Sequence, residues 1–454
     1  MNFVFQNISS RNNLNQNENR QLLLIIVLFI FAPFVIFLYA LFTYQNRNSQ
    51  IIIVLFTALF GFNMIAESEG MDLSRNHELL LYYNQFSVFE IVKTYFEGIF
   101  HTNNSKSVKN EDLEQNLDLY IGFFGVIVSR FTTNAKVFMA VLGLIYGFVF
   151  VKSMQKFIEI QPKSLLSSIP VLCAAFMMPL EQLAGVRYAT ATYLFFWGVI
   201  SVLNNNNSKY YILLFFACLT HFSFMIPTFL FVAFRFYSMN INDTKIKILY
   251  VIFIVSFFFP NLTLNLLTND FIKNIVGAGL QNRSSEYTNV EQNTQSAIDY
   301  LANSAWYIVY PFKLVFWFVY SVVFVKYIPF FKIKHSITSD KLLVWMLILL
   351  SFSNFSNGVS NLGYRLLLVT TVFFFYYLLK LYSENKDLQI VKRLLYFALL
   401  FISLKIILEI RFTLEYLTPI FFYGSVFHII NDNATISLWT HISDFIFTLS
   451  HRKA

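Results

Sequence analysis

Residues 178–235 read MPLEQLAGVRYATATYLFFWGVISVLNNNNSKYYILLFFACLTHFSFMIPTFLFVAFR. This stretch consists of two apolar runs joined by the polar turn NNNNSK at 204–209, and the apolar runs contain one arginine, Arg187, and one histidine, His221. A charged side chain at the centre of a membrane helix costs about 2.5–3.5 kcal/mol on insertion scales, so such groups usually face a bundle interior or a wet cavity. We therefore take this pair as the first candidate for a functional site.

The composition of the chain is that of a membrane protein. Of its 454 residues, 57% are hydrophobic and 13% are charged, whereas soluble domains carry about 25% charged residues. The apolar residues form repeated blocks of roughly 17–25 residues, the length that crosses a bilayer as a helix, without the alternation of a barrel strand. We expect an all-α, polytopic integral membrane protein with about 12–14 transmembrane or re-entrant helices.

The polar segments define the predicted organisation. A single membrane-embedded domain is expected over residues 21–430, between a polar N-terminal tail at 1–20 and a C-terminal tail at 431–454. Long polar loops are predicted at 67–115 and at 269–303. The net charge of +8 is spread over short loops, which indicates membrane orientation rather than nucleic-acid binding.

Lysine-rich loops predict which ends of the helices face the cytoplasm. The loops at 326–341 and 380–393 each carry several basic residues, so both are expected on the cytoplasmic side. The loop 269–303 and the tip 357–363 then lie outside, and Arg187 enters from the external face. The side of segment 67–115 is left open by the sequence.

The run 209–235 conflicts with this orientation if it crosses the membrane once, because Arg235 would then lie outside. A helix break near Thr220 and His221 would keep both ends cytoplasmic. Each half would have about 12 residues, or about 18 Å, which is too short to span. A broken helix at membrane depth is tolerated where it lines a cavity or is buried in protein. We therefore expect a helical hairpin with His221 at its apex.

Two arginines occupy similar positions at the starts of apolar runs. Arg187 lies among small residues, which let neighbouring helices approach closely, and Arg365 follows the polar stretch SNFSNGVSN. The rigid fork of donors on an arginine suits a phosphate or diphosphate, so two arginines at one depth could clamp one anion. The alternative for each is an interfacial arginine whose charge snorkels to the lipid headgroups.

Several further polar residues are candidates for the site. His221 could donate a hydrogen bond to phosphate or accept a proton, or it could be a satisfied core histidine. Asp72 with Arg75, and Glu181 just before the Arg187 run, could bind sugar hydroxyls or take a proton from one; the alternative is a solvated loop charge. Arg283 lies in the loop 269–303, which could hold a glycan or be a plain connection.

No motif for a bound cofactor is present in the sequence. Cys173 and Cys218 each lie inside an apolar run without metal-ligand spacing, and no zinc, Walker, kinase or hydrolase signature occurs. We therefore expect no metal and no cofactor, so that an enzyme built on this chain would work by positioning and charge stabilisation.

The order of several short motifs resembles a known family. Arg187-Tyr188-x-x-Ala191, a turn with Lys209, and Ala217-x-x-x-His221-x-Ser223 follow one another. This order is similar to that in the EpsG-type, Wzy-like polysaccharide polymerases of bacteria. Upstream, Gly70-x-Asp72 followed by Tyr82-Tyr83-x-x-Phe86 looks like a further family segment, and Gly363-Tyr364-Arg365 resembles its later arginine segment. Thr190 departs from the family's usual aliphatic residue, and extra charge surrounds Asp72.

The resemblance implies a GT-C-like membrane glycosyltransferase that polymerises undecaprenyl-diphosphate-linked repeat units into O-antigen, capsule or exopolysaccharide. The reaction would take place without metal at the external face of the bacterial cytoplasmic membrane. Arg187, Arg365 and His221 would be catalytic, and Tyr188 and Tyr364 would join the sugar-binding candidates. The expected partners are lipid-linked donor and acceptor and membrane lipids; a chain-length regulator is left open. The alternatives are a flippase for lipid-linked glycans and an O-antigen ligase-like transferase.

Overall fold

The computed structural model describes residues 20–65, 80–100, 119–178, 186–205, 207–238, 243–267, 306–327, 341–359, 362–384 and 389–451. Within these ranges the chain is helical, and the one pairing of strand type is an isolated bridge between Met64 and Leu417. The principal helices after an N-terminal helix at Arg20–Phe31 are α2 (Pro33–Phe42), α3 (Arg47–Asn63), α5 (Val88–Phe100), α7 (Leu119–Ser129), α8 (Ala135–Ile160), α9 (Leu165–Phe176), α10 (Val186–Asn205), α11 (Tyr211–Thr220), α12 (Met225–Ser238), α13 (Asp243–Ser256), α14 (Leu262–Leu267), α18 (Trp306–Tyr327), α19 (Lys341–Phe355), α20 (Leu362–Glu384), α21 (Gln389–Tyr416), α22 (Ile420–Tyr423), α23 (Val426–Ile430) and α24 (Leu438–His451).

Three of the described helices, α8, α10 and α20, are long and apolar enough to cross a membrane, and shorter apolar helices surround them. The central helix is α20, with 89% of its most apolar stretch buried. On the outer helices, large apolar side chains such as Val251, Phe397 and Ile407 are exposed. Exposed apolar area on this scale is rare in soluble monomers. The chain is therefore an all-helical membrane protein, as predicted.

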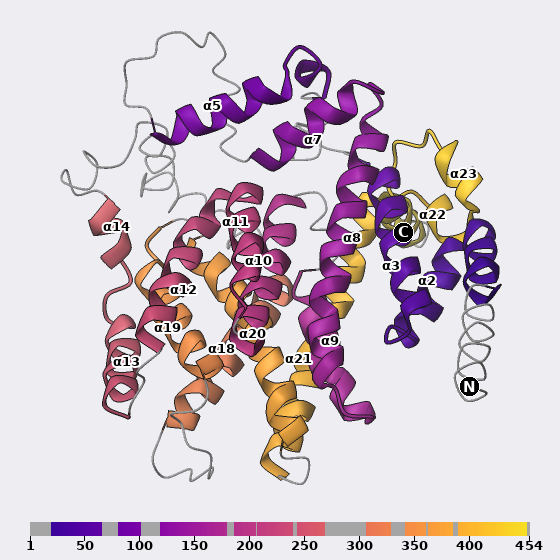
Figure 1. The fold of residues 1–454 in the computed structure, drawn as a ribbon. Coiled ribbons are helices and arrows are strands. Elements are labelled where there is room, and N and C mark those ends of the chain that lie inside the picture. Colours follow the sequence, from indigo (N-terminus) through magenta and orange to yellow (C-terminus); the bar gives the residue numbers. More distant parts are fainter. Residues whose placement is uncertain are drawn as a thin grey trace, which may run out of the picture.

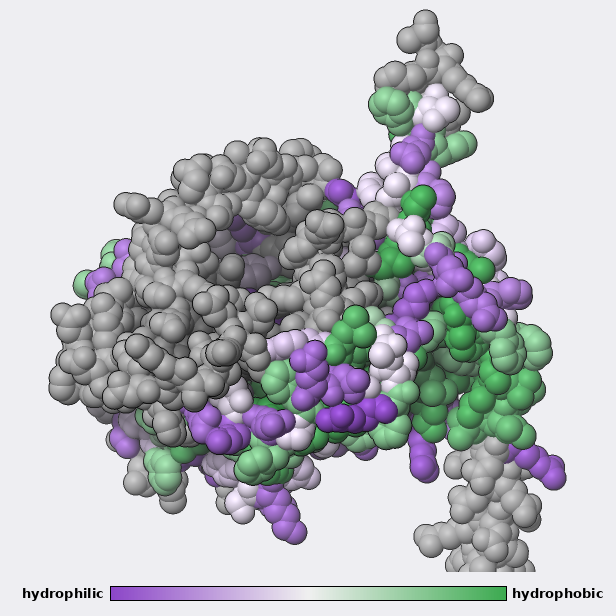
Figure 2. Space-filling view, turned by 90° about the horizontal axis from the view of Figure 1, so that it is seen from above, coloured by the Kyte–Doolittle hydropathy of each residue, from purple (hydrophilic) through white to green (hydrophobic). Residues whose placement is uncertain are grey.

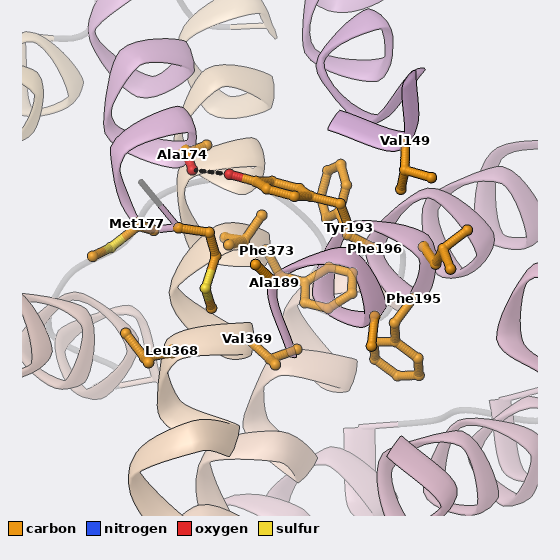
Figure 3. Close-up of a cluster of buried hydrophobic side chains, with 14 of the residues drawn as sticks. Val149, Ala174, Met177, Ala189, Tyr193, Phe195, Phe196, Leu368, Val369 and Phe373 are labelled. Atoms are coloured by element: carbon orange, nitrogen blue, oxygen red, sulfur yellow. Dashed lines mark hydrogen bonds between the residues drawn. The ribbon is translucent and has the colours of Figure 1, made fainter. Parts of the chain in front are cut away.

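Aromatic side chains fill the core between α8, α9, α10 and α20. Figure 3 shows Phe195 and Phe196 of α10 beside Phe373 of α20, with Met177 at the end of α9 facing them. The hydroxyl of Tyr193 donates to the Ala174 carbonyl at 3.2 Å, which satisfies a polar group that would otherwise be costly to bury. This packing fixes α10 against α20, and these two helices carry the arginines of interest.

The helices of the bundle share two ends. Helices α10 and α20 begin at the same end, at Val186 and Leu362, where Tyr188 and Arg365 contact each other. We call this the apex end, because His221, the expected apex of the hairpin, also contacts Tyr188 there. We call the opposite end the base end; there Ser164 bonds to Tyr382 at 3.0 Å and Asn204 to Tyr376 at 3.0 Å. The loops 326–341 and 380–393 follow helix ends at the base. The structure thus groups the helix ends as the charge pattern predicted.

The segment between α3 and α8 begins and ends at the apex end. These two helices run antiparallel in close contact, because Gly61 packs on the backbone of Met139 and Gly143 on that of Thr57, where any Cβ would collide. Between them, α5 and α7 lie across the top of the bundle in Figure 1. With 11 residues, α7 is about 16 Å long, too short to span a bilayer. The described parts of this segment therefore lie at the apex end, a point that the sequence left open.

The run 209–235 folds as a helical hairpin, so the single-crossing alternative is wrong. Helix α11 ends at Thr220, His221 is extended with φ −149° and ψ 118°, and α12 begins at Met225. Contacts pair the two arms in antiparallel order, with Cys218 bonded to Thr228 at 3.3 Å and the ring of Tyr211 6.4 Å from that of Phe231. Pro227 explains the position of the break, because its ring would clash with the carbonyl four residues earlier in a continuous helix.

Two other stretches show structure that the sequence pattern does not reveal. The apolar run 247–268 is long enough for one membrane span, but α13 ends at Ser256 and α14 begins at Leu262. Pro260 lies between them, and the residue before a proline is disfavoured in a helix. The stretch 431–454, described from the sequence as a tail, contains α24, whose Trp439 ring lies 4.9 Å from the Arg411 guanidinium of α21.

Candidate functional site

Tyr188 joins α10 to α20 at the apex end. Its hydroxyl donates a hydrogen bond to the backbone carbonyl of Arg365, and the Arg365 guanidinium lies over its ring, with Cζ 5.5 Å from the ring centroid. The side chain of Tyr188 is buried, with 9% of its surface exposed, whereas Arg365 is half-buried. A cation over an aromatic face is stabilised by about 0.5–2 kcal/mol. Tyr188 therefore holds both the backbone and the charge of Arg365.

His221 lies at the hairpin apex against the same tyrosine. The imidazole meets the Tyr188 ring edge-on at 5.5 Å between centroids, and it is 7% exposed. The ring Nδ1 accepts a hydrogen bond from the backbone N–H of Ser223 at 3.2 Å. The backbone N–H of His221 donates to the Ala217 carbonyl at 3.0 Å, and its backbone carbonyl accepts from the Phe224 N–H at 3.0 Å. The break in the hairpin is thus built on His221, which brings α10, α20 and the hairpin together.

The start of α20 is fixed by a close contact with the end of α19. The Ser353 hydroxyl donates to the Gly363 carbonyl at 2.7 Å, and a Cβ on Gly363 would lie 2.8 Å from the Ser353 carbonyl oxygen. Tyr364 has 42% of its surface exposed and packs edge-on against Phe316 at 5.5 Å. The glycine therefore lets α20 begin directly at the α19 end and presents Tyr364 and Arg365 at its first turn.

Helix starts at the apex end favour an anion. Arg187 is the second residue of α10 and is half-buried, and Arg365 is the fourth residue of α20. A helix N-terminus carries roughly half a positive charge and unpaired N–H groups, which makes it suited to phosphate. Two such termini, each with an arginine in its first turn, are therefore features that favour an anion at this end of the bundle.

Helix α5 covers one side of the hairpin apex. Tyr95 of α5 is buried against Leu219 and Met225, the residues that flank the break at His221, and against Leu119 of α7. Figure 2 looks down on this end, with hydrophilic side chains of the described residues towards the middle and hydrophobic ones along the right-hand margin. One side of the hairpin apex is thus covered by α5 and α7, the helices that precede α8.

The structure brings His221 and Arg365 into contact with the same residue, Tyr188, and Arg187 precedes Tyr188 in the first turn of α10. Tyr364, next to Arg365, faces Phe316. The other sequence-predicted candidates lie outside the described residues: Asp72, Arg75, Glu181 and Arg283. Among the described residues, no group of three or more His, Cys, Asp or Glu side chains is arranged to hold a metal ion.

Two features of the described residues were missed by sequence reasoning. The sequence motif contains Ser223, but it does not show that the Ser223 N–H donates to Nδ1 of His221, which makes His221 the N-cap of the following turn. Lys405 and Glu409 form a buried ion pair on α21, with 1% and 3% of their side chains exposed. A lysine followed by a glutamate four residues later inside an apolar run is the spacing of a helical ion pair, so this signal was present in the sequence.

Comparison with known proteins gives one match. Residues 79–421 match the model of the EpsG family. This range contains α5 to α21 and the contacts of Tyr188 with Arg365 and His221. Neither the curated proteins nor the solved structures contain a match. Because the matched range covers most of the chain, the chain belongs to the EpsG family.

Proposed function

We propose that this protein polymerises undecaprenyl-diphosphate-linked oligosaccharide repeat units into a surface polysaccharide. The observation that carries the proposal is the meeting of Arg365, Tyr188 and His221, from three different elements, at one end of the bundle within the family-matched range. Membership of the EpsG family supports a role in polysaccharide assembly on lipid-linked substrates. The protein would act as a membrane glycosyltransferase with a GT-C-like architecture, in the bacterial cytoplasmic membrane.

The proposed reaction exchanges one oxygen for another at the anomeric carbon of the donor glycan. The bond from this carbon to the diphosphate oxygen breaks, a bond to a hydroxyl oxygen of the acceptor unit forms, and the hydroxyl loses its proton. Negative charge develops on the departing diphosphate. Arg187 and Arg365, with the N-termini of α10 and α20, would stabilise that charge, and charge stabilisation of this kind is the largest contribution in many enzymes.

Charge distribution supports an external location for the reaction. The base end carries the lysine-rich loops that the positive-inside rule assigns to the cytoplasm, so the apex end would face outward. Asp72, Arg75, Glu181 and Arg283 are proposed for sugar contacts, together with Tyr364. Tyr188 was expected to bind substrate, but the hydrogen bond from its hydroxyl to Arg365 favours a role in positioning.

Arginine substitutions test the proposal in cells. We expect Arg187→Ala and Arg365→Ala each to abolish long polymer and to leave single repeat units. Removing one group that stabilises the developing negative charge lowers the rate by about 100-fold or more. Arg235→Ala is the matched control, because Arg235 is also half-buried but lies in the last turn of α12, far from the hairpin apex. The measurement is the glycan ladder from cells with equal amounts of inserted protein. Normal chain length in both apex-end variants would refute the proposal.

A deletion strain separates polymerisation from transport. If the protein is the polymerase, cells without it will carry single repeat units at the surface in place of long chains. If it is a flippase, the units will accumulate on the cytoplasmic side and the surface will lack both. If it is a ligase, cells without it will keep full-length polymer attached to the lipid carrier.

A further inference from the structure

The contacts of His221 indicate which nitrogen of its ring carries the proton. The backbone N–H of Ser223 points at Nδ1 over 3.2 Å, and the Ser223 hydroxyl lies 2.9 Å from the same atom. A backbone N–H can only donate a hydrogen bond, so Nδ1 must present its lone pair. A neutral imidazole carries its one proton on the other nitrogen. His221 is therefore the Nε2–H tautomer in this fold.

The hairpin break makes this tautomer a structural requirement. His221 is the N-cap of the short 3-10 turn Phe222–Phe224, and its side chain accepts from the Ser223 N–H at the position where a helix start needs an acceptor. A proton on Nδ1 would turn that hydrogen bond into a repulsion between two donors. The same hairpin contact orients the ring, which packs at 5.5 Å against Tyr188 and at 6.4 Å against Phe224.

We propose that His221 acts as a fixed Nε2–H donor to the departing diphosphate and is not the base that deprotonates the acceptor. This assignment rests on the proposed function for the identity of the anion. The Tyr188 ring that contacts the imidazole also carries the Arg365 guanidinium, so the two groups are held on one aromatic side chain. As the bond from the anomeric carbon to the phosphate oxygen breaks, the oxygen keeps the electron pair, and Nε2–H and Arg365 stabilise it.

The proton balance of the step does not involve His221. The acceptor hydroxyl oxygen forms the new bond to the anomeric carbon and releases its proton to water, while the imidazole keeps its single proton throughout. A general base at this position would need a free lone pair on Nε2, and a neutral ring whose Nδ1 lone pair caps Ser223 has none there. The geometry thus separates two roles that the sequence alone allowed for His221.

Three substitutions of His221 distinguish the capping role of Nδ1 from the donor role of Nε2–H. In His221→Gln, the amide N–H group reaches about as far as Nε2. In His221→Asn, the amide oxygen can replace Nδ1 as the cap, but the side chain ends short of Nε2. His221→Ala loses both. Each purified variant is given repeat units extracted from the deletion strain. We expect His221→Gln to keep activity within about tenfold of the parent, and the Asn and Ala variants to lose about 100-fold, the usual effect of removing one such donor.

Two activity patterns would overturn the proposal. If His221→Gln is as inactive as His221→Ala, a titrating imidazole is needed and the base role holds. If His221→Asn is as active as the parent, the cap alone matters and the donor is not used.

A spectroscopic measurement tests the tautomer without any assay of activity. The chain has seven histidines, and nitrogen-15 NMR of the histidine-labelled protein in lipid, compared with His221→Gln, identifies the His221 signals. We expect a protonated Nε2 and a bare Nδ1. A proton on Nδ1, or an imidazolium, would overturn the proposal even if the protein polymerises glycans. A correct tautomer in a protein without polymerase activity would instead refute the proposed function.

Discussion

Tyr188 is the residue on which the candidate site is assembled. Its hydroxyl bonds to the Arg365 carbonyl, its face carries the Arg365 guanidinium, and its edge meets His221. The sequence predicted that Arg187, His221 and Arg365 would share one end of the bundle. It could not predict the tyrosine contacts, because Tyr188 and Arg365 are 177 positions apart and their approach depends on the packing of whole helices.

Replacing Tyr188 by phenylalanine tests its positioning role. Tyr188→Phe keeps the ring beside His221 and removes one hydrogen bond, worth about 1 kcal/mol, so we expect polymerisation to slow by roughly tenfold or less; Tyr188→Ala, which removes the ring, should lose more. Tyr193→Phe is the control, because it removes a similar bond to the Ala174 carbonyl in the core. The rate per folded protein is measured. Equal rates for the two phenylalanine variants would contradict the role.

At the scale of elements, the sequence predicted the hairpin, but it did not show all the residues that cause the break. The charge at both ends of 209–235 required a break, and the structure has it at His221. The roles of Ser223 and Pro227 emerge only once the break is located, because each acts through residues two to four positions away. The path of α5 and α7 was open for a different reason, since an 11-residue apolar helix is compatible with either a short crossing or a surface helix.

The ion pair on α21 gives a prediction for that element. Lys405 and Glu409 are both buried, and removal of one partner from a buried pair costs about 3–5 kcal/mol, whereas apolar replacement of both is often neutral. We expect Lys405→Met to lower the thermal stability of the purified protein in detergent far more than the double variant Lys405→Met with Glu409→Leu. The measurement is thermal unfolding. An equal loss of stability in the single and the double variant would mean that the interaction between Lys405 and Glu409 does not contribute to stability.

At the scale of the whole molecule, composition and apolar blocks predicted the all-helical membrane class, and lysine-rich loops predicted which helix ends lie together. The structure reproduces that grouping through contacts such as Ser164 with Tyr382 at the base end and Ser353 with Gly363 at the apex end. The sequence could not show how helices far apart in the chain surround α20. That arrangement follows from the shapes of buried aromatic side chains, which no local pattern encodes.

Cysteine labelling tests the orientation of the whole molecule. Asn357 near the apex end and Lys209 at the base end are both exposed, and the native Cys173 and Cys218 are buried. In spheroplasts, a membrane-impermeant maleimide should label Asn357→Cys and not Lys209→Cys, with the parent protein as the background control. Both should react after the membrane is opened. Labelling of Lys209→Cys alone in intact spheroplasts would invert the proposed orientation.

The central claim is that this bundle, without another protein, joins lipid-linked repeat units at its apex end. The most direct measurement uses the purified protein in lipid vesicles with repeat units extracted from the deletion strain, followed by electrophoresis of the glycans. The account predicts a ladder of lengthened chains from the parent protein and none from Arg365→Ala. Units that cross the vesicle membrane with their length unchanged would contradict it.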